Sequence, residues 1–172
     1  MEDPDLTVHP LAGYPEEVGT ALWMLEDTRA RTLAALDGID PDHVDVLPPG
    51  GDNTIGALLY HVAAIELDWL CADVLIEDFP AWAYELFPDD VRTTIGHLAA
   101  AEGVPLADHL DRLARVRARL LEALRGLDLA SYRRPARTGS GTVTPEWVLH
   151  HLRQHEGEHR GHLQEIRRRL ET

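Results

Sequence analysis

Two histidines near the C-terminal end of the sequence are spaced to bind one metal ion. The segment 147–166 reads WVLHHLRQHEGEHRGHLQEI, and within HEGEH it places His155 and His159 four residues apart. Residues at positions i and i+4 lie on the same face of a helix, so both imidazoles can reach one ion. The same letters match the HExxH pattern of zinc proteases. The spacing therefore indicates a metal site and leaves its chemistry open.

A third ligand is available on an earlier apolar segment. His61 lies beside Leu58, Val62 and Ile65, which repeat at helical spacing. If this stripe packs against the C-terminal helix, its imidazole comes close to the histidine pair. Three neutral imidazoles with open positions match catalytic zinc, nickel, iron or manganese sites. Hydrogen-bonded core histidines are the alternative, but the three together favour a divalent metal.

Other polar residues near this pair have candidate roles of their own. Glu156 lies about 60° around the helix from His159, so it could act as a general base or line the edge of the apolar face. His151 and His162 flank the same sector, where they could hydrogen-bond to the ligands or line a pocket. Four histidines lack partners at ligand spacing and are predicted to have surface or capping roles: His9, His43, His97 and His109.

A zinc protease is disfavoured by the short segment after the histidine pair. Such enzymes take a third ligand from downstream, yet only thirteen residues come after His159, and Gly161 and His162 do not fall at the metzincin spacing. The chain has no lysine, which excludes Schiff-base catalysis and a P-loop. Its two serines, Ser131 and Ser140, lie outside any nucleophile-elbow pattern, which argues against a serine hydrolase.

Apolar residues repeat at helical spacing over four long segments, and no segment of similar length alternates like a strand. The predicted helices cover residues 15–36, 54–76, 106–124 and 145 to nearly the end, with Thr144 capping the last one. The prediction is an all-α fold, a four-helix bundle with a long connection between helices two and three. A short helix is predicted near residues 91–101, and residues 131–143 are predicted to form a polar loop.

Length and composition set the remaining expectations. A chain of 172 residues with 44% hydrophobic content is predicted to form a single domain over residues 1–172. We expect a cytoplasmic protein, because the N-terminus does not resemble a signal peptide and no apolar run approaches the ~20 residues of a membrane span. The formal net charge of −14 argues against nucleic acid or an anionic membrane as a partner.

The sequence resembles the DinB and YfiT-like superfamily along essentially its whole length. The resemblance rests on His61 in NTIGALLYHVAAIE and on the closing HxxxHRGHL segment. It implies a four-helix bundle in which three histidines, here His61, His155 and His159, hold a divalent metal. Arg160 and Gly161 match the family's usual HRGQ, whereas His162 stands where glutamine is common.

This resemblance also suggests a function. Relatives include S-transferases that use bacillithiol or mycothiol, a mycothiol-dependent maleylpyruvate isomerase domain and metal-dependent hydrolases. The expected activity is thiol S-transfer or hydrolysis on a small-molecule substrate, with a metal that lowers the pKa of a thiol or water. Bacillithiol or another low-molecular-weight thiol would be the cosubstrate, and a homodimer is suggested. The alternative is a noncatalytic metal-binding stress-response or ligand-sequestering module, whose structural site would close with a fourth protein ligand.

Overall fold

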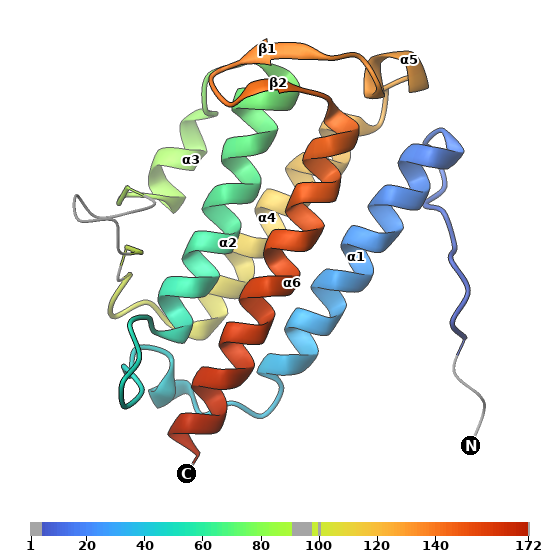
Figure 1. Ribbon diagram of the computed structural model, residues 1–172. Coiled ribbons are helices and arrows are strands. Elements are labelled where there is room, and N and C mark those ends of the chain that lie inside the picture. Colours follow the sequence, from blue (N-terminus) through green and yellow to red (C-terminus); the bar gives the residue numbers. More distant parts are fainter. Residues whose placement is uncertain (1–4, 91–97, 100, 172) are drawn as a thin grey trace.

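The computed structural model describes residues 5–90, 98, 99 and 101–171. Within these residues, four long helices lie side by side and shorter elements connect them (Figure 1). The long helices are α1 (Glu16–Leu36), α2 (Ile55–Trp69), α4 (Leu106–Leu124) and α6 (Pro145–Leu170). The shorter elements are η1 (Pro41–His43), η2 (Leu70–Leu75), α3 (Ala81–Leu86), α5 (Leu129–Tyr132), β1 (Ala136–Thr138) and β2 (Gly141–Val143). The predicted all-α class is confirmed.

Threonine side chains begin the two helices that carry the histidines. The Thr54 hydroxyl accepts a hydrogen bond of 3.1 Å from the backbone N–H of Ala57, and the Thr144 hydroxyl accepts one of 3.0 Å from that of Trp147. Each bond satisfies an amide that has no partner within its helix. Pro145 occupies the first turn of α6. These caps fix where α2 and α6 begin.

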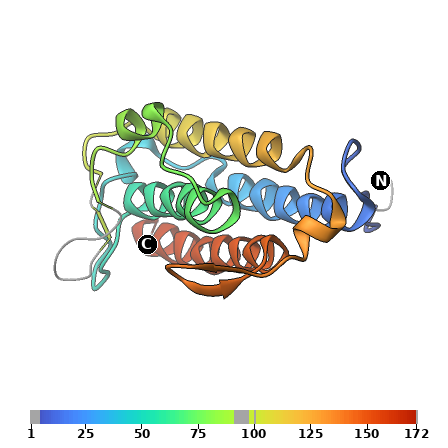
Figure 2. The same ribbon diagram turned by 90° about the horizontal axis from the view of Figure 1, so that it is seen from above.

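The long helices run in two directions. In Figure 1, α1 and α6 point one way, whereas α2 and α4 point the other. Viewed from above, α4 and α6 lie on opposite sides with α1 and α2 between them (Figure 2). The chain must return along the molecule to pass from α2 to the parallel α4, which explains the length of the connection between them. Its described part contains α3; the short helix predicted near residues 91–101 lies largely outside the described residues.

Helix α2 is the core of the molecule. By length and composition alone, Ile55–Leu75 could cross a membrane, with a mean hydropathy of 1.4 over its most apolar window. The expectation that no apolar run approaches the length of a membrane span is therefore wrong for this segment. However, 78% of that window is buried inside the molecule, as in the core helix of a soluble protein. Apolar side chains on α1, α4 and α6 cover α2.

The predicted polar loop at residues 131–143 is wrong in its details. Its first part belongs to α5, and β1 and β2 form an antiparallel hairpin in which Thr138 pairs with Gly141. Asp73, buried in η2, accepts hydrogen bonds from the hydroxyl groups of Thr138 and Ser140. Strands of three residues are too short to show an alternating pattern, and their anchor lies about 65 residues away in the sequence.

His109 is another correction, because it was predicted to have a surface or capping role. The side chain is fully buried on α4, and its Nδ1 accepts a hydrogen bond of 2.9 Å from Arg112. Burial, together with the Arg112 charge, lowers the pKa of His109 to about 4, although Asp45 and Asp108 act in the opposite direction. The fold therefore holds this imidazole in its neutral form.

This burial predicts acid sensitivity. Between pH 6.5 and 4 the histidine of the unfolded chain is protonated while the buried one is not, so protons favour unfolding. The contribution is fully present above pH 6.5 and is lost as the pH falls toward 4. Urea unfolding of wild type and His109→Gln at pH 7 and pH 4.5 measures it. The wild type should lose about 2 kcal/mol more than the variant. An equal loss in both proteins would show that His109 does not contribute.

Candidate metal centre

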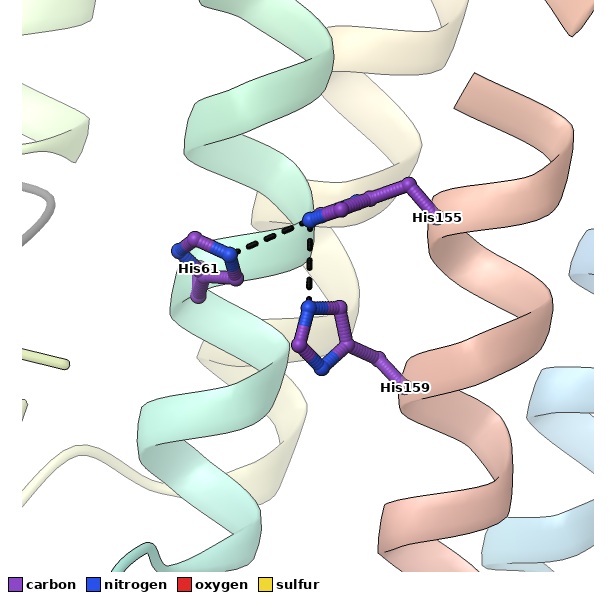
Figure 3. A group of neighbouring side chains, drawn as sticks. All are labelled: His61, His155 and His159. Carbon is purple, nitrogen blue, oxygen red and sulfur yellow. Dashed lines mark hydrogen bonds between the residues drawn. The ribbon is translucent and has the colours of Figure 1, made fainter. Parts of the chain in front are cut away.

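The three predicted metal ligands converge between α2 and α6. His61 extends from α2, and His155 and His159 extend from successive turns of α6 toward it (Figure 3). The Nε2 atom of His155 lies 3.1 Å from Nε2 of His61 and 3.1 Å from Nε2 of His159. Ligand atoms of all three histidines lie within 4.8 Å of one another. The structure thus brings together the residues that the sequence placed on separate segments.

The spacing of these nitrogens fits a shared ion. Imidazole nitrogens bind zinc at about 2.0 to 2.1 Å, so two nitrogens on one ion at bond angles of 90 to 109° lie about 2.9 to 3.4 Å apart. The two Nε2 distances of 3.1 Å fall in this range. Among the described residues, the group of side chains close enough to share an ion contains histidines alone, without a carboxylate. This ligand set suits zinc, nickel or iron better than calcium or magnesium.

The histidine group is buried on the side of His61 and partly exposed to solvent on the side of His155 and His159. His61 is 1% exposed, whereas His155 and His159 are half-buried. On α6 the pair is flanked by the buried Leu152 and Leu163. The half-buried side allows a small molecule to approach.

His162 and His151 extend the centre along α6. His162 lies one turn after His159, and their Nδ1 atoms are 3.3 Å apart. Because His159 directs Nε2 toward the other two rings, this contact can fix its orientation and tautomer. His151 stacks on Trp147 with ring centres 5.1 Å apart, and its ring centre lies 5.9 Å from that of His155. Burial lowers the pKa of His151.

Glu156 stands where an HExxH protease has its general base, but here it lies among buried charged residues. Its side chain is 2% exposed and lies among buried charges. Arg29 Nε donates to Oε1 at 2.7 Å, and Arg117 Nη2 donates to Oε2 at 3.2 Å. Both carboxylate oxygens therefore accept hydrogen bonds from guanidinium groups. A catalytic role for Glu156 stays a prediction.

Sequence reasoning missed the other members of this buried cluster. Arg29, Glu66 and Arg117 come from α1, α2 and α4, and all three are more than nine-tenths buried. Arg29 lies four residues after Leu25, and Arg117 lies four residues after Leu113, so each charge falls within an apolar stripe. A charged residue within an apolar stripe was the feature of the sequence that could have indicated this buried cluster.

A cavity of about 290 Å³ opens between α2 and the connection toward α4. Ala64 and Asp68 line it from α2, one and two turns beyond His61, and Phe79, Tyr84 and Phe87 line it from the connection toward α4. Asp68 is half-buried, and burial together with the nearby Asp73 raises its pKa. The cavity combines an apolar wall with a few polar groups, as small-molecule sites commonly do.

Comparisons with known proteins bear on the fold and the family of the chain. A crystal structure of a conserved protein from Enterococcus faecalis aligns with 88% of this chain and 96% of its own, with a TM-score of 0.66 and 19% identity, a likeness that shows the fold alone. No curated protein matches the chain significantly. The sequence profile of the DinB superfamily matches residues 24–163, a stretch that contains all three converging histidines. With most of its length matched in this way, the chain belongs to the DinB superfamily.

Proposed function

We propose that this protein is a metal-dependent enzyme acting on a small molecule, with a divalent metal held by His61, His155 and His159. The observation that carries the proposal is the approach of the three Nε2 atoms. When bound, such a metal lowers the pKa of a thiol or water at its open position. Thiol S-transfer is proposed ahead of hydrolysis, on the family resemblance.

The reactive thiol would come from a cosubstrate. Cys71, the sole cysteine of the chain, is 1% exposed and lies in η2, ten residues beyond His61. Burial raises the pKa of the Cys71 thiol, and the Glu77 carboxylate raises it further. A buried thiol with a raised pKa is a poor nucleophile. Bacillithiol or a similar low-molecular-weight thiol is therefore the proposed donor.

The side chains around the centre have separate tasks in this proposal. His162 orients the His159 ring through its Nδ1 atom, and the half-buried side of the centre admits the thiol. The cavity beside α2 would receive the body of the electrophile against the rings of Phe79, Tyr84 and Phe87. Where these rings exclude water from the bound electrophile, transfer to the thiol would be favoured over hydrolysis.

Elemental analysis and a conjugation assay together test the proposal. The purified protein should bind one zinc, nickel, iron or manganese ion per chain, and the metal-loaded form should conjugate bacillithiol to a haloaromatic electrophile with release of halide. Chelation should abolish the activity and added metal should restore it. His155→Ala should lose metal and activity, whereas His150→Ala, an exposed histidine on the same helix, should keep both.

Other outcomes point to other functions. Conjugation that survives chelation would contradict metal-activated thiol chemistry. Release of product only from hydrolysable substrates, in the presence of metal, would favour a hydrolase. Stoichiometric metal without turnover of either kind would favour a noncatalytic metal-binding or ligand-sequestering module.

A further inference from the structure

Four buried charged residues, one from each long helix, form a closed cluster at the centre of the molecule. We name them the charge square: Arg29 of α1, Glu66 of α2, Arg117 of α4 and Glu156 of α6. Each arginine bonds both glutamates. Two guanidinium groups face two carboxylates, so the ionised square has no net charge.

The bonds of the square leave few polar atoms unsatisfied. Arg29 donates to Glu156 at 2.7 and 3.3 Å and to Glu66 at 2.9 Å, and its remaining nitrogen donates to the Leu113 carbonyl. Arg117 donates to Glu66 at 2.7 and 2.9 Å and to Glu156 at 3.2 Å. Pairing of this kind offsets the high cost of burying four charges. Bidentate hydrogen bonding by a guanidinium also fixes the orientation of the carboxylate that it contacts, which a single point charge would not do.

The position of Glu156 on α6 links the square to the two histidines of that helix. Glu156 comes directly after His155, so its side chain leaves the helix about 100° around the axis from His155 and about 60° from His159. When the carboxylate is held between Arg29 and Arg117, both histidines are directed toward α2. A rotation of α6 by about 10° would move a nitrogen about 6 Å from the axis by about 1 Å. Metal ligands tolerate only about 0.2 Å.

We propose that Glu156 is a positioning residue, which sets the rotation of α6 through the charge square and thereby aligns His155 and His159 with His61. The inference rests on the proposed metal site. The glutamate of the HEGEH segment acts through helix packing, since guanidinium groups take up both of its oxygens.

Metal affinity of the folded protein tests this role. Glu156→Gln removes one charge of the square with little change in volume, and Glu158→Gln makes the same change at an exposed position of the same segment. At a temperature where circular dichroism shows each protein folded, competition with a chelator gives the affinity, and cobalt substitution gives a visible spectrum of the ligand geometry. Glu156→Gln should bind metal at least about 10-fold more weakly, with an altered cobalt spectrum, and Glu158→Gln should match the wild type.

The same measurements can overturn the proposal. Unchanged affinity and spectrum in folded Glu156→Gln, with only a lower melting temperature, would show that the square merely stabilises the fold. Normal metal binding with turnover lost would show that Glu156 is a catalytic base instead. If Glu156→Gln does not fold, the same measurements are made on Arg29→Lys. This variant keeps the positive charge but loses the bidentate hydrogen bonds to Glu156. An unchanged metal affinity of Arg29→Lys would contradict the proposal. A wild type that binds no metal contradicts the proposed function as well.

Discussion

Replacing His61 with alanine is expected to weaken metal binding by at least about 100-fold. Changes around metal ligands already cost 10- to 100-fold, and this substitution removes a ligand itself. His61 is also the one member of the group that comes from α2, so the variant leaves two imidazoles on a single helix. Isothermal titration of the metal-free protein with zinc measures the change directly.

Thermal unfolding gives an independent measure of the same effect. A ligand that binds only the folded state stabilises it by about 2.7 kcal/mol at a free concentration 100 times its Kd. Zinc should therefore raise the melting temperature of the wild type and leave that of His61→Ala almost unchanged. His150→Ala, exposed on α6, should respond like the wild type. Equal zinc responses in all three proteins would remove His61 from the ligand set.

Replacing Arg117 with methionine is expected to lower the free energy of unfolding by about 3 to 5 kcal/mol. Arg117 is 4% exposed and its guanidinium bonds Glu66, Glu156 and Glu26, so its loss leaves buried carboxylates facing one arginine fewer. Breaking a buried pair in this way costs more than the pair contributes relative to apolar residues, because an uncompensated charge remains. Urea unfolding followed by circular dichroism measures the loss.

The matched control for this variant lies two residues away on the same helix. Arg119 donates to Glu77 at 2.8 Å, but both side chains are about a third or more exposed to solvent. Exposed pairs contribute at most about 1 kcal/mol, so Arg119→Met should have a small effect. Similar losses for the two variants would mean that burial does not determine the strength of these contacts.

The sequence allowed the long helices and the histidine cluster to be predicted, for a common reason. Helical periodicity depends on residues that are close in sequence. It predicted the helix ends that matter for the histidine group to within a few residues. The i, i+4 spacing of His155 and His159 is local as well. His61 required the further assumption that two apolar stripes pack together, and the structure places them so.

Features held by contacts distant in sequence could not be predicted in the same way. The partners of Arg117 in the charge square lie 39 and 51 residues away, and a charge within an apolar stripe does not reveal its partner. His109 was predicted to have a surface or capping role because it lacked a partner at ligand spacing, although it lies one turn after Leu106 on a buried face. The hairpin depends on Asp73, which no local pattern connects with it.

The order of the helices along the chain has a consequence for synthesis on the ribosome. A nascent chain that has completed α1, α2 and α4 already holds His61, two arginines of the square and Glu66, but it lacks the fourth charge and both remaining imidazoles. The apolar face of α2 that α6 covers also stays exposed until then. Docking of α6 therefore brings the fourth charge to the square and both remaining histidines to His61 in one event, so three imidazoles are available to a metal ion only after α6 has docked.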